Sequence, residues 1–256
     1  FCLVPAELYD AALVIFGYGD GLPTSYTPEA QDRGIVDPRP IPLVVPDWTD
    51  ANNYAYLVDP MVYPVIQISY AQSPGGGSHP ALLYVHGGSW RGGNRRQQGR
   101  PLLHRMAREG WVCVSASYPL APAATFPDQL VALKQAVDWM KTDGRGFGID
   151  SEFIAVCGGS AGGHLAALLA LTAGRPEYQP GFEEADTSVQ AAIPVYGVYD
   201  FLNRNRTRDD WPIIPRHVMK ADVVKDADLF RQASPLDQVH EGAPPFMVIH
   251  GEADSV

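Results

Sequence analysis

Short, continuous apolar runs alternate with helical patterns from residue 81 onward, and this alternation limits the fold more than any other sequence feature. The run 81–85 has the continuous apolar composition of a strand buried on both faces, and four more runs predict strands: 111–116, 153–157, 190–195 and 246–250. Between the second and third, apolar residues recur at helical spacing from Leu130 to Met140. Strands separated by helices predict an α/β fold with a mostly parallel central sheet flanked by helices.

The first 80 residues lack this alternation. Prolines recur throughout 1–80, so no long helix fits between them after about residue 20. Alternation over 65–70 predicts one strand there. We therefore expect an irregular N-terminal segment at 1–80, either a cap or leading strands, and one domain at 81–256. Within that domain, the connection 200–235 is equally compatible with a lid over a site and with an amphipathic helix packed on the sheet.

Composition excludes several classes of function. The chain has 19 basic and 29 acidic residues, a net charge of −10, which argues against a nucleic-acid partner. Its three cysteines lie far apart, without the spacing of a disulfide framework or a zinc site. The longest apolar runs fall well short of the ~18 residues that a membrane span needs. The oligomeric state and the compartment stay open, with a cytoplasmic or membrane-associated location favoured.

A Gly-x-Ser-x-Gly motif, Gly158-Gly159-Ser160-Ala161-Gly162, stands between a predicted strand and a predicted helix. Glycines on both sides of a serine permit a sharp strand-to-helix turn that exposes the hydroxyl. The positive end of the following helix favours negative charge developing beside Ser160. A phosphate-binding turn is the alternative, and the strand-to-helix context favours a nucleophile.

A second glycine-rich motif, His86-Gly87-Gly88-Ser89-Trp90, ends the strand predicted at 81–85. Two consecutive glycines allow backbone N–H groups to point at an oxyanion, whereas an ordinary glycine turn would have no such role. We expect His86 to brace this loop and not to act as a base.

Five motifs together carry a family resemblance: 86–90 (HGGSW), 118–122 (YPLAP), 126–128 (FPD), 158–164 (GGSAGGH) and 250–254 (HGEAD). In order and spacing they resemble the α/β-hydrolase fold across 81–256, specifically the hormone-sensitive-lipase-like carboxylesterases and lipases. Ser89 departs from the third glycine that is frequent in this group. The first motif is also similar to that of arylformamidases, so the substrate class stays open.

The resemblance implies a role for each matching residue. Ser160 would be the nucleophile, the N–H groups of Gly87, Gly88 and Ala161 would form the oxyanion hole, and Asp254 would be the acid of the triad. The implied activity is hydrolysis of a small-molecule carboxylic ester through an acyl-enzyme, with no metal or organic cofactor.

The histidine base of such a triad follows the acid, yet no histidine follows Asp254 in this sequence. We therefore expect the chain to be truncated at its C-terminus and inactive, or nearly so, by itself. His217 is the best substitute base, His164 is expected to be packed, and Glu252 is the fallback acid. Two alternatives remain: an arylformamidase-like amide hydrolase, and a non-catalytic protein of the same fold that binds a small ligand.

Overall fold

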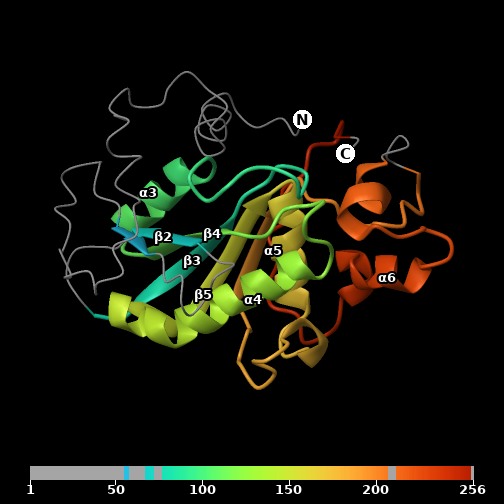
Figure 1. The fold of residues 1–256 in the computed structure, drawn as a ribbon. Coiled ribbons are helices and arrows are strands. Elements are labelled where there is room, and N and C mark those ends of the chain that lie inside the picture. The colour runs from blue at the N-terminus through green and yellow to red at the C-terminus, as the bar shows by residue number, and fades with distance from the viewer. Residues whose placement is uncertain (1–54, 58–66, 72–76, 207–211, 255–256) are drawn as a thin grey trace.

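The computed structural model describes residues 55–57, 67–71, 77–206 and 212–254. Within these ranges one six-stranded sheet runs in the order β1-β2-β4-β3-β5-β6 (Figure 1). Its strands are β1 (Ala55–Leu57), β2 (Gln67–Ala71), β3 (His79–Val85), β4 (Val112–Ser117), β5 (Ile149–Gly159) and β6 (Ala191–Val195). The four strands from β3 onward are parallel, while β1 and β2 pair antiparallel at one edge. The predicted mostly parallel sheet is confirmed.

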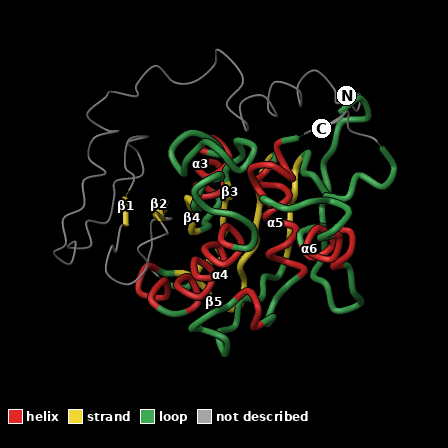
Figure 2. Tube along the Cα trace, turned by 45° about the vertical axis from the view of Figure 1, so that its right-hand side comes forward, coloured by secondary structure: helices red, strands yellow, loops and turns green. Residues whose placement is uncertain are grey.

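Helices cover both faces of this sheet (Figure 2). They are α3 (Arg100–Arg108), α4 (Asp128–Lys141), α5 (Ala161–Leu171) and α6 (Ala227–Gln232), with short turns of helix η1 (Asp143–Phe147), η2 (Pro176–Tyr178), η3 (Ile214–Met219) and η4 (Pro235–Gln238). Successive side chains of a strand point to opposite faces. Accordingly, Leu83 and Val85 of β3 join the core with α4 and α5, whereas Leu82 and Tyr84 pack with Leu103 of α3.

Two predictions at the borders of the domain turned out differently in detail. The strand expected at 65–70 overlaps β2, which begins at Gln67. Residues 65 and 66, like most of the 1–80 segment, lie outside the described residues. The strand expected at 246–250 is not regular: two isolated parallel bridges join it to β6. Its backbone hydrogen bonds among the described residues go to β6 and to Tyr196 just past it, and Met247 is 61% exposed. The run therefore lies beside β6 without forming a regular strand, and no second described strand pairs with it.

The described residues of the connection 200–235 form two short helices, η3 and α6, where the sequence was equally compatible with a lid and with a packed amphipathic helix. Its apolar residues Phe201, Ile214, Val218, Met219 and Phe230 are buried in the core. Residues 207–211 lie outside the described part of the chain. This segment is therefore anchored to the domain by its core-facing side chains, and its role as a lid stays a prediction. No helix in the described ranges is both long and apolar enough to cross a membrane.

A buried cation secures the segment between α5 and β6. Lys134 of α4 is fully buried, and its ammonium donates to the carbonyl oxygen of Thr172 (2.5 Å), to Thr187 Oγ1 (3.1 Å) and to Gln179 Oε1 (3.4 Å). Burial lowers the pKa of Lys134 to about 8, because three neutral acceptors replace bulk water only in part. The lysine thus ties three points of the 172–187 segment to α4.

Replacing Lys134 with methionine should lower the free energy of unfolding at pH 7 by about 1–3 kcal/mol, because buried acceptors lose their donor. The pH dependence should change as well. Between the folded pKa of about 8 and the ordinary value of 10.5, the unfolded chain binds more protons, so in the wild type this lysine makes stability rise with pH. Urea unfolding at several pH values measures both effects. Lys225→Met, at an exposed position, is the control. If the free energy of unfolding of Lys134→Met rose with pH as much as that of the wild type, the assignment would be wrong.

Candidate functional site

The carboxyl ends of β3, β5 and β6 form one edge where the backbone repeatedly enters a rare conformation. Positive φ angles occur at Ser89 (53°) and Trp90 (58°) after β3, at Ser160 (56°) after β5 and at Tyr196 (38°) after β6. Residues with a side chain seldom adopt such angles, and strain of this kind concentrates at functional sites. In parallel sheets, ligands bind beyond the carboxyl ends of strands. This edge is therefore the candidate site.

Ser160 occupies the turn between the end of β5 and the first residue of α5. Its N–H donates to the carbonyl oxygen of Val195 (3.0 Å), and its carbonyl accepts from the N–H of His164 (3.0 Å). These bonds fix the turn on both sides, and the side chain is half-buried. The hydroxyl therefore stands at the N-terminus of an eleven-residue helix, where a developing negative charge is favoured.

The turn is tight because α5 approaches β3 at backbone distance. A Cβ atom on Gly162 would lie 2.1 Å from the carbonyl oxygen of Val85 and 2.6 Å from that of His86. Only glycine fits there. The spacing of the Gly-x-Ser-x-Gly motif is thus explained by packing as well as by the turn.

The 86–90 loop lies directly against Ser160. A Cβ atom on Gly87 would be 3.3 Å from Ser160 Cβ and 2.7 Å from the carbonyl oxygen of Gly159. The N–H of Gly87 donates to Gln98 Oε1 at 2.8 Å, so its hydrogen bond is taken in this structure. Sequence reasoning missed Gln98, since nothing in the Gly/Arg-rich stretch around it marks one acceptor. The oxyanion roles of Gly87, Gly88 and Ala161 stay predictions.

His86 braces this loop, as expected. Its side chain is fully buried, its Nδ1 donates to the carbonyl oxygen of Gly87 (2.8 Å), and its ring stacks on Tyr118 at 4.3 Å. The Tyr118 hydroxyl in turn donates to the His86 carbonyl oxygen (3.0 Å). Burial lowers the pKa of His86, which keeps the imidazole neutral.

Asp254 lies on the segment that follows the predicted last strand. The N–H of Tyr196, just past β6, donates to the carbonyl oxygen of Ile249 (2.6 Å), so this segment reaches the same sheet edge as Ser160. Figure 1 shows the last described part of the chain, coloured red, at the end of the sheet where α5 begins. Asp254 Oδ2 is 3.7 Å from His250 Nε2. The role of Asp254 as triad acid stays a prediction.

Tyr196 is a site residue that the motifs did not single out. A Cβ atom on Gly159 would lie 2.7 Å from the Tyr196 hydroxyl oxygen, so the phenol packs beside the residue that precedes Ser160. Its position directly after the strand predicted at 190–195 was the available signal, because the ends of parallel strands meet at the site.

All seven histidines lie in the described part of the chain, and none of them hydrogen-bonds to the Ser160 hydroxyl. His164 is buried with both ring nitrogens bonded, which confirms that it is packed. His217 lies half-buried in η3, and Glu252 is exposed. Among the described residues, no cluster of three or more His, Cys, Asp or Glu side chains could hold a metal ion.

Known structures share this fold. A bifunctional GH43-CE protein of Bacteroides eggerthii superposes with a TM-score of 0.67 at 22% identity, covering 73% of this chain and 29% of that chain. Esterase 2 of Thermogutta terrifontis, phosphonylated by sarin, gives a TM-score of 0.61 at 22% identity, covering 73% of this chain and 68% of that chain. The chain therefore has the α/β-hydrolase fold.

Curated relatives are more similar in sequence. Esterase LipQ of Mycobacterium tuberculosis is 47% identical over 176 residues, 68% of this chain and 42% of LipQ. Probable carboxylic ester hydrolase LipM of the same organism is 44% identical over 182 residues, 70% of this chain and 42% of LipM. Arylacetamide deacetylase of Oryctolagus cuniculus is 40% identical over 93 residues, 35% of this chain and 23% of that protein. The chain spans well under half the length of these relatives. Since the BD-FAE family model matches residues 68–256, which include the Ser160 turn and the whole parallel sheet, the chain belongs to the BD-FAE family.

Proposed function

We propose that this chain carries the nucleophile of an esterase that cleaves small carboxylic esters through an acyl-enzyme. The observation that carries the proposal is the position of Ser160: a positive-φ turn at the N-terminus of α5, with the Gly87 backbone packed against it. The relatives LipQ and LipM, named as an esterase and a carboxylic ester hydrolase, support the choice of an ester.

In this proposal, the Ser160 oxygen attacks the ester carbonyl while its proton passes to a general base. Negative charge on the former carbonyl oxygen is stabilised by backbone N–H groups of Gly88 and Ala161, with Gly87 contributing if its N–H turns from Gln98 to the substrate. The alcohol leaves with a proton, and water then releases the acid. Asp254 orients and stabilises the base. None of these steps needs a metal or an organic cofactor.

Amide hydrolysis is the second candidate, because one relative is named an arylacetamide deacetylase. The same oxyanion chemistry serves both bonds, and an amide differs chiefly in needing its leaving nitrogen protonated. A site that merely binds a small ligand is the third outcome, and it would leave the serine unreactive.

The full-length protein should hydrolyse 4-nitrophenyl acetate and butyrate, and a fluorophosphonate should form one adduct, mapped by peptide mass spectrometry to Ser160. Fluorophosphonate labelling and ester hydrolysis both need an oxyanion stabilised beside Ser160, so a variant that loses one of these reactions should lose the other. Faster cleavage of 4-nitroacetanilide than of 4-nitrophenyl acetate would favour the amide hydrolase. Absence of both adduct and turnover in the folded protein would favour the binding protein. A series of longer acyl chains measures the acyl-length preference.

A further inference from the structure

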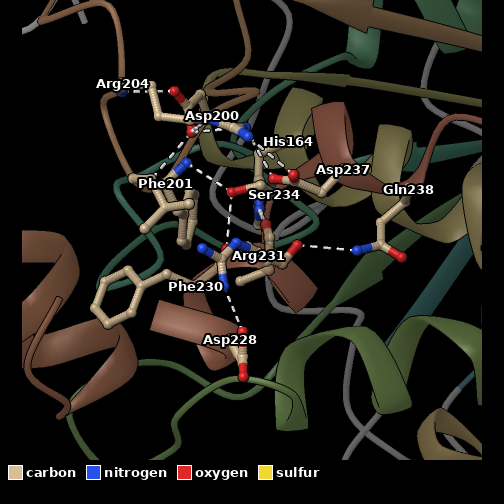
Figure 3. Close-up of polar contacts among 12 residues, drawn as sticks. His164, Asp200, Phe201, Arg204, Asp228, Phe230, Arg231, Ser234, Asp237 and Gln238 are labelled. Atoms are coloured by element: carbon tan, nitrogen blue, oxygen red, sulfur yellow. Dashed lines mark hydrogen bonds and ion pairs between the residues drawn. The ribbon is translucent and has the colours of Figure 1, made fainter. Parts of the chain in front are cut away.

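Three segments far apart in the sequence meet at the imidazole of His164, four residues after Ser160 on α5. Its Nδ1 accepts from Trp90 Nε1 at 3.1 Å, and its Nε2 bonds to the carbonyl oxygen of Ala233 at 2.8 Å. Its ring stacks on Phe201 with 4.3 Å between centroids and 14° between planes. The ring is 1% exposed, and Figure 3 shows it beside the connection that carries Phe201 and Ser234. One buried side chain thus links the nucleophile helix, the 86–90 loop and the 200–235 connection.

The two hydrogen bonds determine which nitrogen of His164 carries the proton. An indole N–H can only donate, so Nδ1 must hold a lone pair. A backbone carbonyl oxygen can only accept, so Nε2 must carry a hydrogen. The imidazole is therefore neutral and in a single tautomer. Neither a protonated ring nor the other tautomer satisfies both partners.

On the loop side, Trp90 is held from several directions. It is 1% exposed and has a φ of 58°, and its carbonyl oxygen accepts from the N–H of Ala121 at 2.8 Å. Its ring meets the rings of His164 and Phe201 edge-on, at 5.2 and 5.3 Å. Since Trp90 follows Gly88 by two residues, the place of the indole sets the place of the loop backbone. The unfavourable φ would relax without such contacts.

On the side of the connection, hydrogen bonds immobilise the groups that His164 touches. The N–H of Phe201 donates to Ser234 Oγ (2.9 Å), and this hydroxyl donates to the carbonyl oxygen of Phe230 (2.7 Å) (Figure 3). Nearby, Arg204 bridges Asp200 and Asp237. The connection therefore gives His164 a fixed stacking partner and a fixed acceptor.

We propose that His164 is a positioning residue: its neutral imidazole ties the 86–90 loop, through Trp90, to α5 and to the 200–235 connection, and so sets the oxyanion donors against Ser160. The catalytic consequence rests on the proposed function, whereas the coupling of the loop does not. Its role differs from plain core packing, because it requires a directed Trp90 to His164 hydrogen bond that ring packing alone would not supply.

Trp90→Phe tests this bond, since it removes the indole N–H and keeps an aromatic ring. His164→Phe keeps a ring against Phe201 and removes both hydrogen bonds. Trp139→Phe is the matched control, because Trp139 of α4 is also buried but packs on Phe147 of η1. Each full-length variant is examined by amide hydrogen exchange of the 86–92 backbone, by nitrogen NMR of the His164 ring, and by kcat and KM on 4-nitrophenyl butyrate.

We expect exchange of the loop amides to rise about tenfold in both test variants and to stay unchanged in Trp139→Phe, as local opening becomes easier. The wild-type His164 ring should show one protonated and one bare nitrogen. Because an oxyanion donor is worth ~10²–10³ in kcat, its displacement should lower kcat about tenfold with KM within twofold. The double variant should be no worse than His164→Phe alone, as expected for two residues that act as one unit.

Unchanged loop exchange in Trp90→Phe, or a doubly protonated His164 ring at neutral pH, would overturn the proposal. Multiplying rather than overlapping effects in the double variant would overturn it as well. If the wild type turns over no ester, the proposed function fails, while the exchange and NMR results still decide whether His164 holds the loop.

Discussion

Replacing Ser160 with alanine should lower kcat/KM for 4-nitrophenyl esters by about 10⁴-fold or more in the full-length protein, and should abolish the fluorophosphonate adduct. The loss is large because the serine oxygen forms the bond to the acyl group, so no neighbour can take its place. Alanine meets the same unfavourable φ of 56°, so folding should be little affected. Steady-state kinetics and thermal unfolding of both proteins measure the two effects.

Ser151→Ala is the matched control, because Ser151 lies near the other end of the same strand, β5. Its hydroxyl donates to the neighbouring Glu152 carboxylate. It should retain wild-type kinetics. If Ser160→Ala kept more than a tenth of the activity, or if the adduct moved to another residue, the assignment of the nucleophile would be wrong.

The second large effect is expected in stability. Gly162→Ala should lower the free energy of unfolding by about 3 kcal/mol or more, because the new methyl group would stand 2.1 Å from the Val85 carbonyl oxygen inside a packed junction. Alanine would otherwise gain about 1 kcal/mol in helix propensity, so a net loss reports the clash. For a chain of this size the melting temperature should fall by ~6–12 °C.

Gly146→Ala provides the comparison, since nothing lies within 4 Å of the position its Cβ would take. That variant should change stability by no more than ~0.5 kcal/mol. Differential scanning calorimetry on the three proteins distinguishes the outcomes. If Gly162→Ala melted within 2 °C of the wild type, the close approach of α5 to β3 would be refuted.

Local patterns predicted most of the scaffold. Residues 81–85 of β3, 112–116 of β4 and 154–159 of β5 are buried throughout, as continuous apolar runs predict, whereas Ala191 and Ile193 of β6 are half-buried. The helix predicted after Ser160 is α5, and its nearly all-apolar sequence is buried along all eleven residues. The bracing role of His86 was predicted from its place in the glycine-rich loop, and the packed state of His164 from its place on the helix after Ser160.

The parts that escaped prediction depend on contacts between residues distant in sequence. Gln98 reaches Gly87 across a loop, Lys134 finds acceptors 38 to 53 residues away, and Trp90 meets His164 over 74 residues. No periodicity encodes such pairs, since each requires the fold to be in place first. The irregular pairing at 246–250 has a related cause. An apolar run indicates a strand, but which strands pair with it depends on the other strands of the sheet.

The complete burial of α5 also has a consequence during synthesis. The helix is enclosed by β5, β6, α4 and η4, and two of these lie later in the chain than the helix itself. A nascent polypeptide that has left the ribosome only as far as residue 180 must therefore expose this almost wholly apolar helix on the sides that β6 and η4 later cover. Such a segment is a natural substrate for chaperones, which cover exposed apolar surface until β6 and η4 have been synthesised.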